Sequence, residues 1–356
     1  MSLDIGIVGA GINGMCTAWL LAQDGHKVTV YERSAPMSAT SSASSKLLHG
    51  GLRYLENLEF RLVKEALQER DAWFQRAPHL AKPLQLMIPV YANSRRSRWQ
   101  YAIGLGLYDR LAKSRVVPRS QWHDRQHILA LNTGIQAEGL KGAYSFWDGQ
   151  MDDHALGLWV TEQALAAGVQ LKTNADVQHI SPDGRVHMHN DTTIQHQRVV
   201  NVAGPWAEQL AQNSGTQLKH RLDLVRGSHI VLNQPCSQAW LLEVPGEKRI
   251  FFVLPWQGKT LVGTTEVRQS LSEPTECSQA EQEYLLKAYK HYFPEASYQV
   301  ESNFAGLRPL IKSAANPAQA TREYALEQHG LVTTVLGGKW TTSMALGRKV
   351  KEKVIH

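Results

Sequence analysis

Residues 40–56 combine side chains that could hold an anionic group beside a flat ligand. Their sequence is TSSASSKLLHGGLRYLE, which begins with hydroxyl residues and a lysine and continues into paired glycines. Gly50 and Gly51 let the main chain approach a ligand where a Cβ would collide. Arg53 and Tyr54 add a planar cationic fork and a phenol hydroxyl, which suit an oxyanion. Taken by itself, the stretch also fits a serine-rich loop that caps a helix beginning near Leu52.

A dinucleotide-binding pattern lies directly upstream of this stretch. Residues 5–8 predict a short apolar strand, GAGING follows at residues 9–14, and a helical pattern comes next. Residues 27–32 predict a second strand that ends in Glu32, 18 residues after Gly14. In this βαβ context, G-x-G-x-x-G places a pyrophosphate at the helix N-terminus and the acid on the ribose hydroxyls. The pattern does not separate NAD from FAD.

Two later strands end in comparable glycine turns. Residues 198–202 predict a buried parallel strand that runs into Gly204. Near the end of the chain, residues 331–336 predict another strand, which GGKWTT and a final helix follow. Ligands of open α/β sheets bind at the carboxyl ends of the strands. We therefore expect Gly204, Lys339 and the start of the last helix to converge on one ligand.

The rest of the pattern predicts a second, mostly antiparallel sheet. Residues 222–263 contain successive short strands with tight turns, inserted between parts of the nucleotide-binding pattern. The expected fold class is α/β (α+β overall), with a Rossmann-like domain on a parallel sheet and an interleaved substrate domain. The expected division gives 1–80, 146–216 and 303–356 to the nucleotide-binding domain, and 81–145 and 217–302 to the substrate domain.

The composition describes an enzyme-sized globular chain. Its 356 residues are 43% hydrophobic and 20% charged, with a net charge of +6 and a pI of about 9.1. The positive charge is scattered, so we expect no nucleic-acid partner, whereas an anionic substrate or surface fits. The three cysteines lie far apart without a CxxC pair, as in a reducing compartment. No signal peptide or apolar run of about 20 residues is recognised, so we expect a cytoplasmic protein, at most peripheral on the inner face of the membrane.

Two further segments allow two interpretations each. Residues 95–108, RRSRWQYAIGLGLY, fit contact with a membrane surface, and they also fit an amphipathic helix packed on the second domain. His187, His189 and His196 alternate on a polar hairpin, where two histidines on one face could bind a metal. Because no carboxylate or thiolate partner is near in the sequence, we expect these histidines to face solvent and to bind no metal.

Together these motifs resemble the FAD-dependent glycerol-3-phosphate dehydrogenases, within the D-amino-acid-oxidase-like flavoenzymes. The resemblance rests on a series in family order: GAGING, residues 40–56, VNVAGPW, RGSHIVL, RIFFVLPW, GTTE, GLRPL, QATREY and GGKWTT. Two departures stand out. The sequence ends at His356, before the helical C-terminal extension usual in the family, and Trp340 and Ser343-Met344 stand where the family more often has Leu and a Tyr-Arg pair.

The resemblance implies FAD as the cofactor, extended across the parallel sheet. Lys339 and the last helix would stabilise the negative charge that reduced flavin gathers near N1 and the C2 oxygen. The implied cofactor contacts are Gly9, Gly11, Asn13, Gly14, Glu32, Ser41, Ser42, Ser44, Lys46, Leu47, His49, Gly50, Gly51, Ala203, Gly204, Trp206, Gly306, Arg308, Gly338, Lys339, Trp340, Thr341 and Thr342.

The resemblance implies a small phosphorylated polyol as substrate, sn-glycerol 3-phosphate, and dihydroxyacetone phosphate as product. Hydride would pass from C2 to flavin N5 while His229 takes the hydroxyl proton, and the electrons would leave to a quinone or another acceptor. The implied catalytic residues are His229, Arg308, Arg53, Tyr54, Arg249, Arg322 and Lys339. Each arginine also fits a surface ion pair, and His229 also fits a core histidine bonded to the backbone.

Two other functions fit the sequence. An oxidase of an amino acid or a 2-hydroxy acid, of the glycine-oxidase or 2-hydroxyglutarate-oxidase type, would also hold its carboxylate with arginine. A non-catalytic flavin-binding subunit is the alternative from a different class. Reduction of the flavin by glycerol 3-phosphate, by glycine or by 2-hydroxyglutarate separates these functions.

Overall fold

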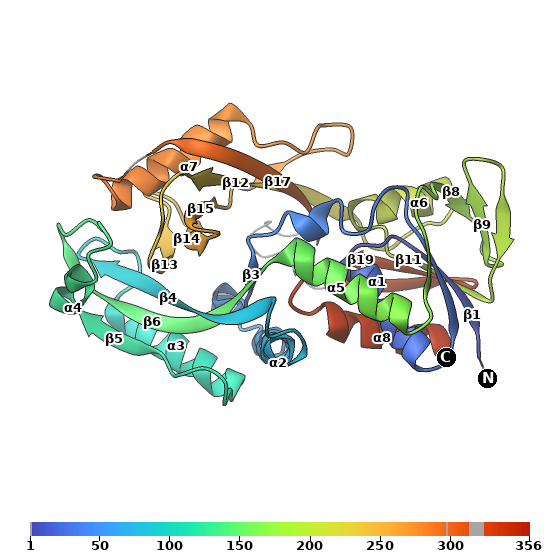
Figure 1. Ribbon diagram of the computed structural model, residues 1–356, viewed down its shortest axis with the longest axis horizontal. Coiled ribbons are helices and arrows are strands. Elements are labelled where there is room, and N and C mark those ends of the chain that lie inside the picture. The colour runs from blue at the N-terminus through green and yellow to red at the C-terminus, as the bar shows by residue number, and fades with distance from the viewer. Residues whose placement is uncertain (1, 297, 313–323) are drawn as a thin grey trace.

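A parallel sheet and a larger, mostly antiparallel sheet make up the two ends of the molecule (Figure 1). The computed structural model describes residues 2–296, 298–312 and 324–356. Both chain termini lie beside the parallel sheet, whereas the larger sheet and its helices occupy the opposite end. The expected fold class, a Rossmann-like parallel sheet joined to a mostly antiparallel one, is confirmed.

The smaller of these two sheets has six strands in the order β18-β19-β11-β1-β2-β7. Neighbouring strands from β19 to β7 run parallel, and β18 runs antiparallel to β19. Because the parallel strands share one direction, their carboxyl ends meet along one edge. The strands are β1 (Asp4–Val8), β2 (Lys27–Tyr31), β7 (Gln170–Lys172), β11 (Arg198–Asn201), β18 (Tyr324–His329) and β19 (Val332–Gly337).

Three helices cover one face of this sheet and bury their apolar sides on it. α1 (Ile12–Gln23) packs between α5 (Asp153–Ala166) and α8 (Ser343–Ile355), two helices from distant parts of the sequence (Figure 1). Met15 and Leu21 of α1 are fully buried in the shared core. The first strand, first helix and second strand therefore form the βαβ unit that the sequence predicts.

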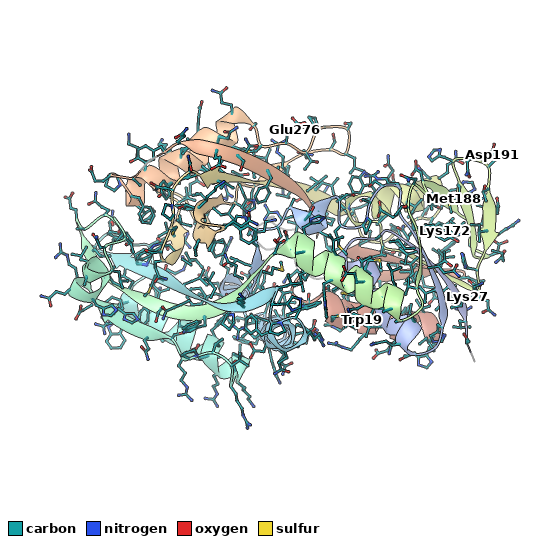
Figure 2. All side chains as sticks on the ribbon, in the orientation of Figure 1. Trp19, Lys27, Lys172, Met188, Asp191 and Glu276 are labelled. Carbon is teal, nitrogen blue, oxygen red and sulfur yellow. The ribbon has the colours of Figure 1, made fainter. Side chains whose placement is uncertain are left out.

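A three-stranded antiparallel sheet extends the end of the molecule that holds the parallel sheet (Figure 1). It contains β8 (Val177–Ile180), β9 (Arg185–Met188) and β10 (Thr193–Gln195), next to α6 (Ala207–Asn213), with Asp191 at its tip (Figure 2). Contrary to the expectation that it faces solvent, His196 is buried, because Asp4 and the Tyr31 hydroxyl bind its two ring nitrogens.

The larger sheet has ten strands in the order β16-β12-β15-β14-β13-β4-β6-β3, with β17 paired to β12 and β5 to β6. Its strands are β3 (Leu47–Leu48), β4 (Ala81–Tyr91), β5 (Gln121–Asp124), β6 (Leu140–Met151), β12 (Leu222–Leu232), β13 (Ala239–Glu243), β14 (Ile250–Trp256), β15 (Lys259–Gly263), β16 (Val267–Arg268) and β17 (Val300–Ile311). The helices that accompany it are α2 (Phe60–Arg76), α3 (Arg98–Ala112), α4 (Arg125–Ala130) and α7 (Gln279–Tyr292).

The predicted antiparallel run over residues 222–263 is present as β12, β13, β14 and β15, and one parallel pair joins β13 to β4. Strands β6 and β17 each cross a boundary of the expected domain division, at 145/146 and 302/303. The exact division therefore stays a prediction. In the part of the chain that the structure describes, no helix combines the length and apolar character needed to cross a bilayer.

Candidate active site

One cavity, of about 880 Å³, runs between the carboxyl edge of the parallel sheet and strands β12 and β17. That volume lies within the range of natural ligand pockets. Gly11, Gly204 and Gly338, which come from three separate turns, all line the cavity. The other predicted residues on its wall are Gly9, Asn13, Glu32, Ser41, Ser42, Ser44, Leu47, His49, Tyr54, Ala203, Trp206, His229, Gly306, Arg308, Lys339, Trp340 and Thr341.

The turn between β1 and α1 forms one end of the cavity. Gly9 has a φ of 111°, and a Cβ at Gly14 would lie 2.0 Å from the Gly9 carbonyl oxygen, so glycine is required at both positions. The turn opens the N-terminus of α1 toward the cavity, where its partial positive charge favours an anion. The Glu32 carboxylate accepts the Ala10 N–H at 2.8 Å and the Ser34 N–H at 3.1 Å. A carboxylate accepts about four hydrogen bonds, so Glu32 keeps capacity for hydroxyl groups of a ligand.

The closing turn before α8 forms another part of the wall. Lys339 places its ammonium nitrogen 3.9 Å from the centre of the Tyr54 ring. That nitrogen is buried and has no hydrogen-bond partner among the described residues. The Trp340 indole N–H donates to the Ser41 carbonyl at 2.9 Å, which ties the closing turn to the loop after β2. A cation and a helix N-terminus are thus held together at one point of the cavity.

The serine-rich loop is anchored by hydrogen bonds of two kinds. The Ser41 hydroxyl oxygen accepts the Ile12 N–H at 2.9 Å, so this side chain links the loop to the start of α1. Ser44 and Lys46 bind the buried Asp153 instead, with the Lys46 ammonium 2.5 Å from a carboxylate oxygen. Ser44 lines the cavity, whereas Lys46 does not, and its ammonium group is held in an internal ion pair with Asp153.

Strands β12 and β17 form the wall opposite the glycine turns. In their antiparallel register Val225 lies opposite Arg308, Gly227 opposite Gly306, and His229 opposite Phe304. Alternate pairs share one face of a sheet, so Arg308 and His229 point to the same side with a glycine pair between them. A Cβ at Gly227 would lie 2.9 Å from Nη2 of Arg308, so glycine there leaves room for the guanidinium.

His229 is a buried histidine with one ring nitrogen bonded and one without a partner. Ser45, which also lines the cavity, makes a 2.9 Å hydrogen bond with Nε2, and the ring stacks on Phe304. Nδ1 finds no hydrogen-bond partner within the described residues. Burial, reinforced by the positive charges of Arg308 and Lys46, lowers the pKa of His229 to about 3. The imidazole is therefore neutral at physiological pH, so one of its two ring nitrogens carries no proton.

Arg308 and Arg249 share the Glu266 carboxylate. Nη1 of Arg308 lies 3.9 Å from one oxygen of Glu266, and Nε of Arg249 lies 3.5 Å from the other. Nη2 of Arg308 donates to the Thr265 carbonyl at 2.9 Å, which fixes the guanidinium at the cavity wall. Arg249 donates to the Thr264 carbonyl at 3.0 Å from behind that wall.

Comparison with known proteins decides the class of this site. The model of the FAD dependent oxidoreductase family, DAO, matches residues 4–351. This chain belongs to the FAD dependent oxidoreductase family. It is 33% identical over 99% of its length to the glycerol-3-phosphate dehydrogenase of Synechocystis, and 30% identical over 95% to the aerobic glycerol-3-phosphate dehydrogenase of Staphylococcus aureus. It spans 69% and 64% of these two relatives, and the resemblance that its motifs indicate is confirmed.

Solved structures of the same fold include two that contain FAD. The glycerol-3-phosphate dehydrogenase of Bacillus halodurans, complexed with FAD, matches 99% of this chain with a TM-score of 0.78 and 25% identity, and the match covers 64% of that protein. The L-alpha-glycerophosphate oxidase of Mycoplasma pneumoniae, with FAD bound, matches 100% of this chain and 95% of its own, with a TM-score of 0.81 and 20% identity. The second likeness shows the fold alone.

The residues of the cavity fit the cofactor of this family, which is FAD. The required glycines at Gly9 and Gly14 open the α1 N-terminus for a pyrophosphate, and Glu32 lies where ribose hydroxyls would be. Two buried polar atoms without a hydrogen-bond partner in the described chain, Asn13 Oδ1 and Lys339 Nζ, belong to residues on the same cavity wall. Bound FAD would give both atoms partners.

Of the predicted site residues that the structure describes, seven do not line the cavity, and packing or internal hydrogen bonds explain six of them. Gly14 packs α1 on β1, and Thr342 begins α8 in a buried position. Gly50 donates its N–H to the Tyr108 hydroxyl and to Asp148, behind the wall. The Tyr54 ring covers Gly51. Lys46 binds Asp153, and Arg249 binds the Thr264 carbonyl. Arg53 lies on the turn Leu52–Asn57 and is not among the residues that line the cavity.

Arg322 lies outside the described residues, so its predicted role stays a prediction. Sequence reasoning missed Ser45, Asp153 and Thr265. Ser45 stands inside the predicted loop and could have been included with its neighbours, but nothing in the sequence indicates that it bonds His229. Asp153 and Thr265 act through contacts between distant segments, which the local pattern does not reveal.

Proposed function

We propose that this flavoenzyme oxidises sn-glycerol 3-phosphate to dihydroxyacetone phosphate. The observation that carries the proposal is the arrangement of Arg308 and His229 on one face of β12 and β17, opposite the glycine turns. A guanidinium binds a phosphate through two parallel hydrogen bonds, and a neutral imidazole accepts a proton. The names of the relatives at 33% and 30% identity support this choice of substrate.

The chain's own residues account for binding and proton movement. Arg308 binds the phosphate, and its bond to the Thr265 carbonyl keeps the guanidinium from turning. His229, whose ring is held by the Ser45 hydroxyl, accepts the hydroxyl proton of C2 as the C2–O bond becomes a carbonyl. When bound, FAD supplies the hydride acceptor for the hydrogen on C2. Lys339 and the start of α8 place positive charge where negative charge then develops.

Anaerobic reduction of the flavin tests the substrate. Purified protein with bound FAD is mixed with glycerol 3-phosphate, glycine or 2-hydroxyglutarate, and the loss of visible flavin absorbance is followed. We expect rapid bleaching by glycerol 3-phosphate alone. Bleaching by either carboxylate in its place would indicate the amino-acid or 2-hydroxy-acid oxidase, and bleaching by none of the three would indicate a non-catalytic flavin subunit.

We further propose that the α3 surface rests on an anionic membrane and passes electrons to a quinone there. Four large apolar side chains are exposed around α3 and the nearby start of α2: Leu58, Phe60, Trp99 and Ile103, with Trp99 75% and Ile103 73% exposed. Exposed cations lie in α3 and in the segments before and after it: Arg95, Arg98, Arg110, Lys113, Arg115 and Arg119. Exposed aromatic and aliphatic groups in a segment rich in cations suit the headgroup region of anionic lipids.

Vesicle binding tests this surface. We expect the protein to sediment with vesicles of phosphatidylcholine and phosphatidylglycerol, but not with phosphatidylcholine alone. Replacing Trp99 and Ile103 together by serine should abolish sedimentation and leave flavin reduction by glycerol 3-phosphate unchanged. The exposed Leu165→Ser on α5, away from this surface, is the control. Equal sedimentation of the double variant and the control would contradict the proposal.

A further inference from the structure

Glu281 is a buried carboxylate that does not line the cavity. It lies in the first turn of α7, shortly after Glu276, which Figure 2 labels. Its two oxygens accept hydrogen bonds from different groups. One oxygen accepts the Ser278 backbone N–H at 3.2 Å, which completes a capping box, and it also accepts the Ser278 hydroxyl at 2.9 Å and contacts Arg226 at 2.8 Å. The other receives the Thr265 hydroxyl at 2.6 Å and the Ser228 hydroxyl at 2.7 Å.

Helix capping does not explain the hydrogen bonds that the second oxygen of Glu281 accepts. A capping box needs the side chain at this position to bind only the helix N-cap residue, here Ser278. The bonds come instead from Ser228, in β12, and from Thr265, in the segment between β15 and β16, so they join α7 to the ten-stranded sheet. Burial by itself would raise the pKa of Glu281, but the hydrogen bonds from Thr265, Ser228 and Ser278 lower it to about 2. The carboxylate is therefore ionised throughout the physiological range, and its charge strengthens each bond.

Ser228 and Thr265 are also bonded to each other. The Ser228 N–H donates to the Thr265 hydroxyl at 2.8 Å, and the Thr265 N–H donates to the Ser228 carbonyl at 3.2 Å. Ser228 directly precedes His229 in β12, and the Thr265 carbonyl accepts Nη2 of Arg308. One carboxylate thus fixes both residues that hold the two candidate catalytic side chains.

We propose that Glu281 is a positioning residue of the active site, which sets Arg308 and His229 relative to each other through Thr265 and Ser228. Any test of this role that uses glycerol 3-phosphate rests on the proposed function. A glutamine at this position carries no charge and has a single acceptor oxygen. If that oxygen stays with Ser278 and Arg226, both hydroxyl bonds are lost, and if it faces Thr265 and Ser228, both become weaker neutral hydrogen bonds. The Thr265 carbonyl then holds Arg308 less firmly, and the phosphate binds more weakly.

Four variants separate positioning from helix capping. Glu281→Gln and Thr265→Val remove or weaken the bonds of the second oxygen, whereas Thr265→Ser keeps the hydroxyl. Ser278→Ala removes the cap and leaves the bonds to Thr265 and Ser228 in place. The glycerol 3-phosphate concentration for half-maximal anaerobic flavin reduction should rise about tenfold in Glu281→Gln and Thr265→Val, as expected for one lost bond to a charged group. Thr265→Ser should return to the wild-type value.

Ser278→Ala should lower the melting temperature without moving the half-saturation concentration. An equal rise of that concentration in Ser278→Ala and Glu281→Gln would overturn the proposal, and so would a fall in melting temperature of Glu281→Gln with unchanged half-saturation. Amide hydrogen exchange gives a readout without substrate. Residues 226–230 and 263–267 should exchange faster in Glu281→Gln than in Ser278→Ala.

The exchange measurement keeps this proposal separate from the proposed substrate. If glycerol 3-phosphate does not bleach the wild-type flavin, the proposed function fails, while faster exchange confined to Glu281→Gln still supports the positioning role. If the wild type is bleached and exchange is the same in both variants, the positioning role fails and the proposed function stands.

Discussion

The two sheets hold their parts of the site by different means. The parallel sheet presents mostly main chain: glycine turns after β1, β11 and β19, and the N-termini of α1 and α8. The ten-stranded sheet presents side chains, above all Arg308 and His229, which stand on neighbouring antiparallel strands. The first region binds through backbone N–H groups and helix dipoles, and the second through a cation and an imidazole.

This difference determines how each region tolerates change. A main-chain cradle depends on the absence of side chains, so a single added Cβ damages it and nothing nearby can compensate. A side-chain wall depends on orientation, which neighbours such as Ser45 and Thr265 supply. We therefore expect damage to the cradle to remove the cofactor and often the fold, and damage to the wall to weaken substrate binding or turnover in a folded flavoprotein.

The largest effect is expected for Gly14→Val. A Cβ here would lie 2.0 Å from the Gly9 carbonyl oxygen, so α1 must move away from β1. Overpacking of this kind costs about 3 kcal/mol or more, and the purified variant should be colourless with a lower melting temperature. Gly106→Ala on α3, where an added Cβ meets nothing within 4 Å, is the matched control. A yellow Gly14→Val protein of wild-type stability would break the comparison.

Next in size is Arg308→Ala, which removes the guanidinium from the cavity wall but leaves the cradle intact. We expect kcat/KM for glycerol 3-phosphate to fall about 100-fold, which corresponds to about 3 kcal/mol, with normal flavin content. Arg308→Lys keeps the charge without the planar fork, so it should recover part of the loss. Steady-state kinetics and the visible spectrum check both variants. Unchanged turnover by Arg308→Ala would exclude the phosphate role.

A smaller effect is expected for Trp340→Phe. The variant loses the 2.9 Å bond from the indole N–H to the Ser41 carbonyl, which joins the closing turn to the serine-rich loop. One such bond contributes about 1 kcal/mol, so the dissociation constant for FAD should rise about fivefold. Titration of the apoprotein with FAD measures this change. Trp159→Phe on α5 is the control. Trp159 makes an edge-to-face contact with Trp19, as Trp340 does with Trp73, but it does not line the cavity, so this variant should bind FAD as the wild type does.

The smallest effect concerns the titration of His229 in the free protein. Its folded-state pKa of about 3 lies below the usual 6.5, so the folded chain binds this proton less readily than the unfolded chain. Stability from this group is therefore complete above pH 6.5 and is lost as the pH falls from 6.5 toward 3. Histidine NMR spectra should show one imidazole that stays neutral at pH 5, and His229→Asn should remove that signal. A titration of this resonance near pH 6.5 would contradict the burial of the ring.

The sequence predicts the parallel region well because its rules are local. The βαβ unit, the glycine turns and the acid at Glu32 follow from spacing within a few dozen residues, and each is present in the structure. The strands of the larger sheet also follow from local pattern. Their pairing does not, since β13 joins β4 in parallel across about 150 residues of sequence.

The side-chain wall is predicted only in part. His229 and Arg308 stand in recognisable motifs and reach the cavity, whereas Lys46 carries a charge that a buried acid over 100 residues away neutralises. Glu281 belongs to an ordinary capping box in the sequence, and its bonds to Thr265 and Ser228 depend on how α7 docks on the sheet. Contacts of this kind are set by tertiary packing, which the local sequence does not encode.

The position of β19 has a consequence for biosynthesis. This strand inserts between β18 and β11 and brings Lys339 and the start of α8 to the cavity. Until β19 and α8 have left the ribosome, the nascent chain lacks one side of the cradle, so capture of the coenzyme must wait for this segment. Products of premature termination ahead of Val332 would emerge without pigment, with an unpaired inner strand exposed to chaperones and proteases.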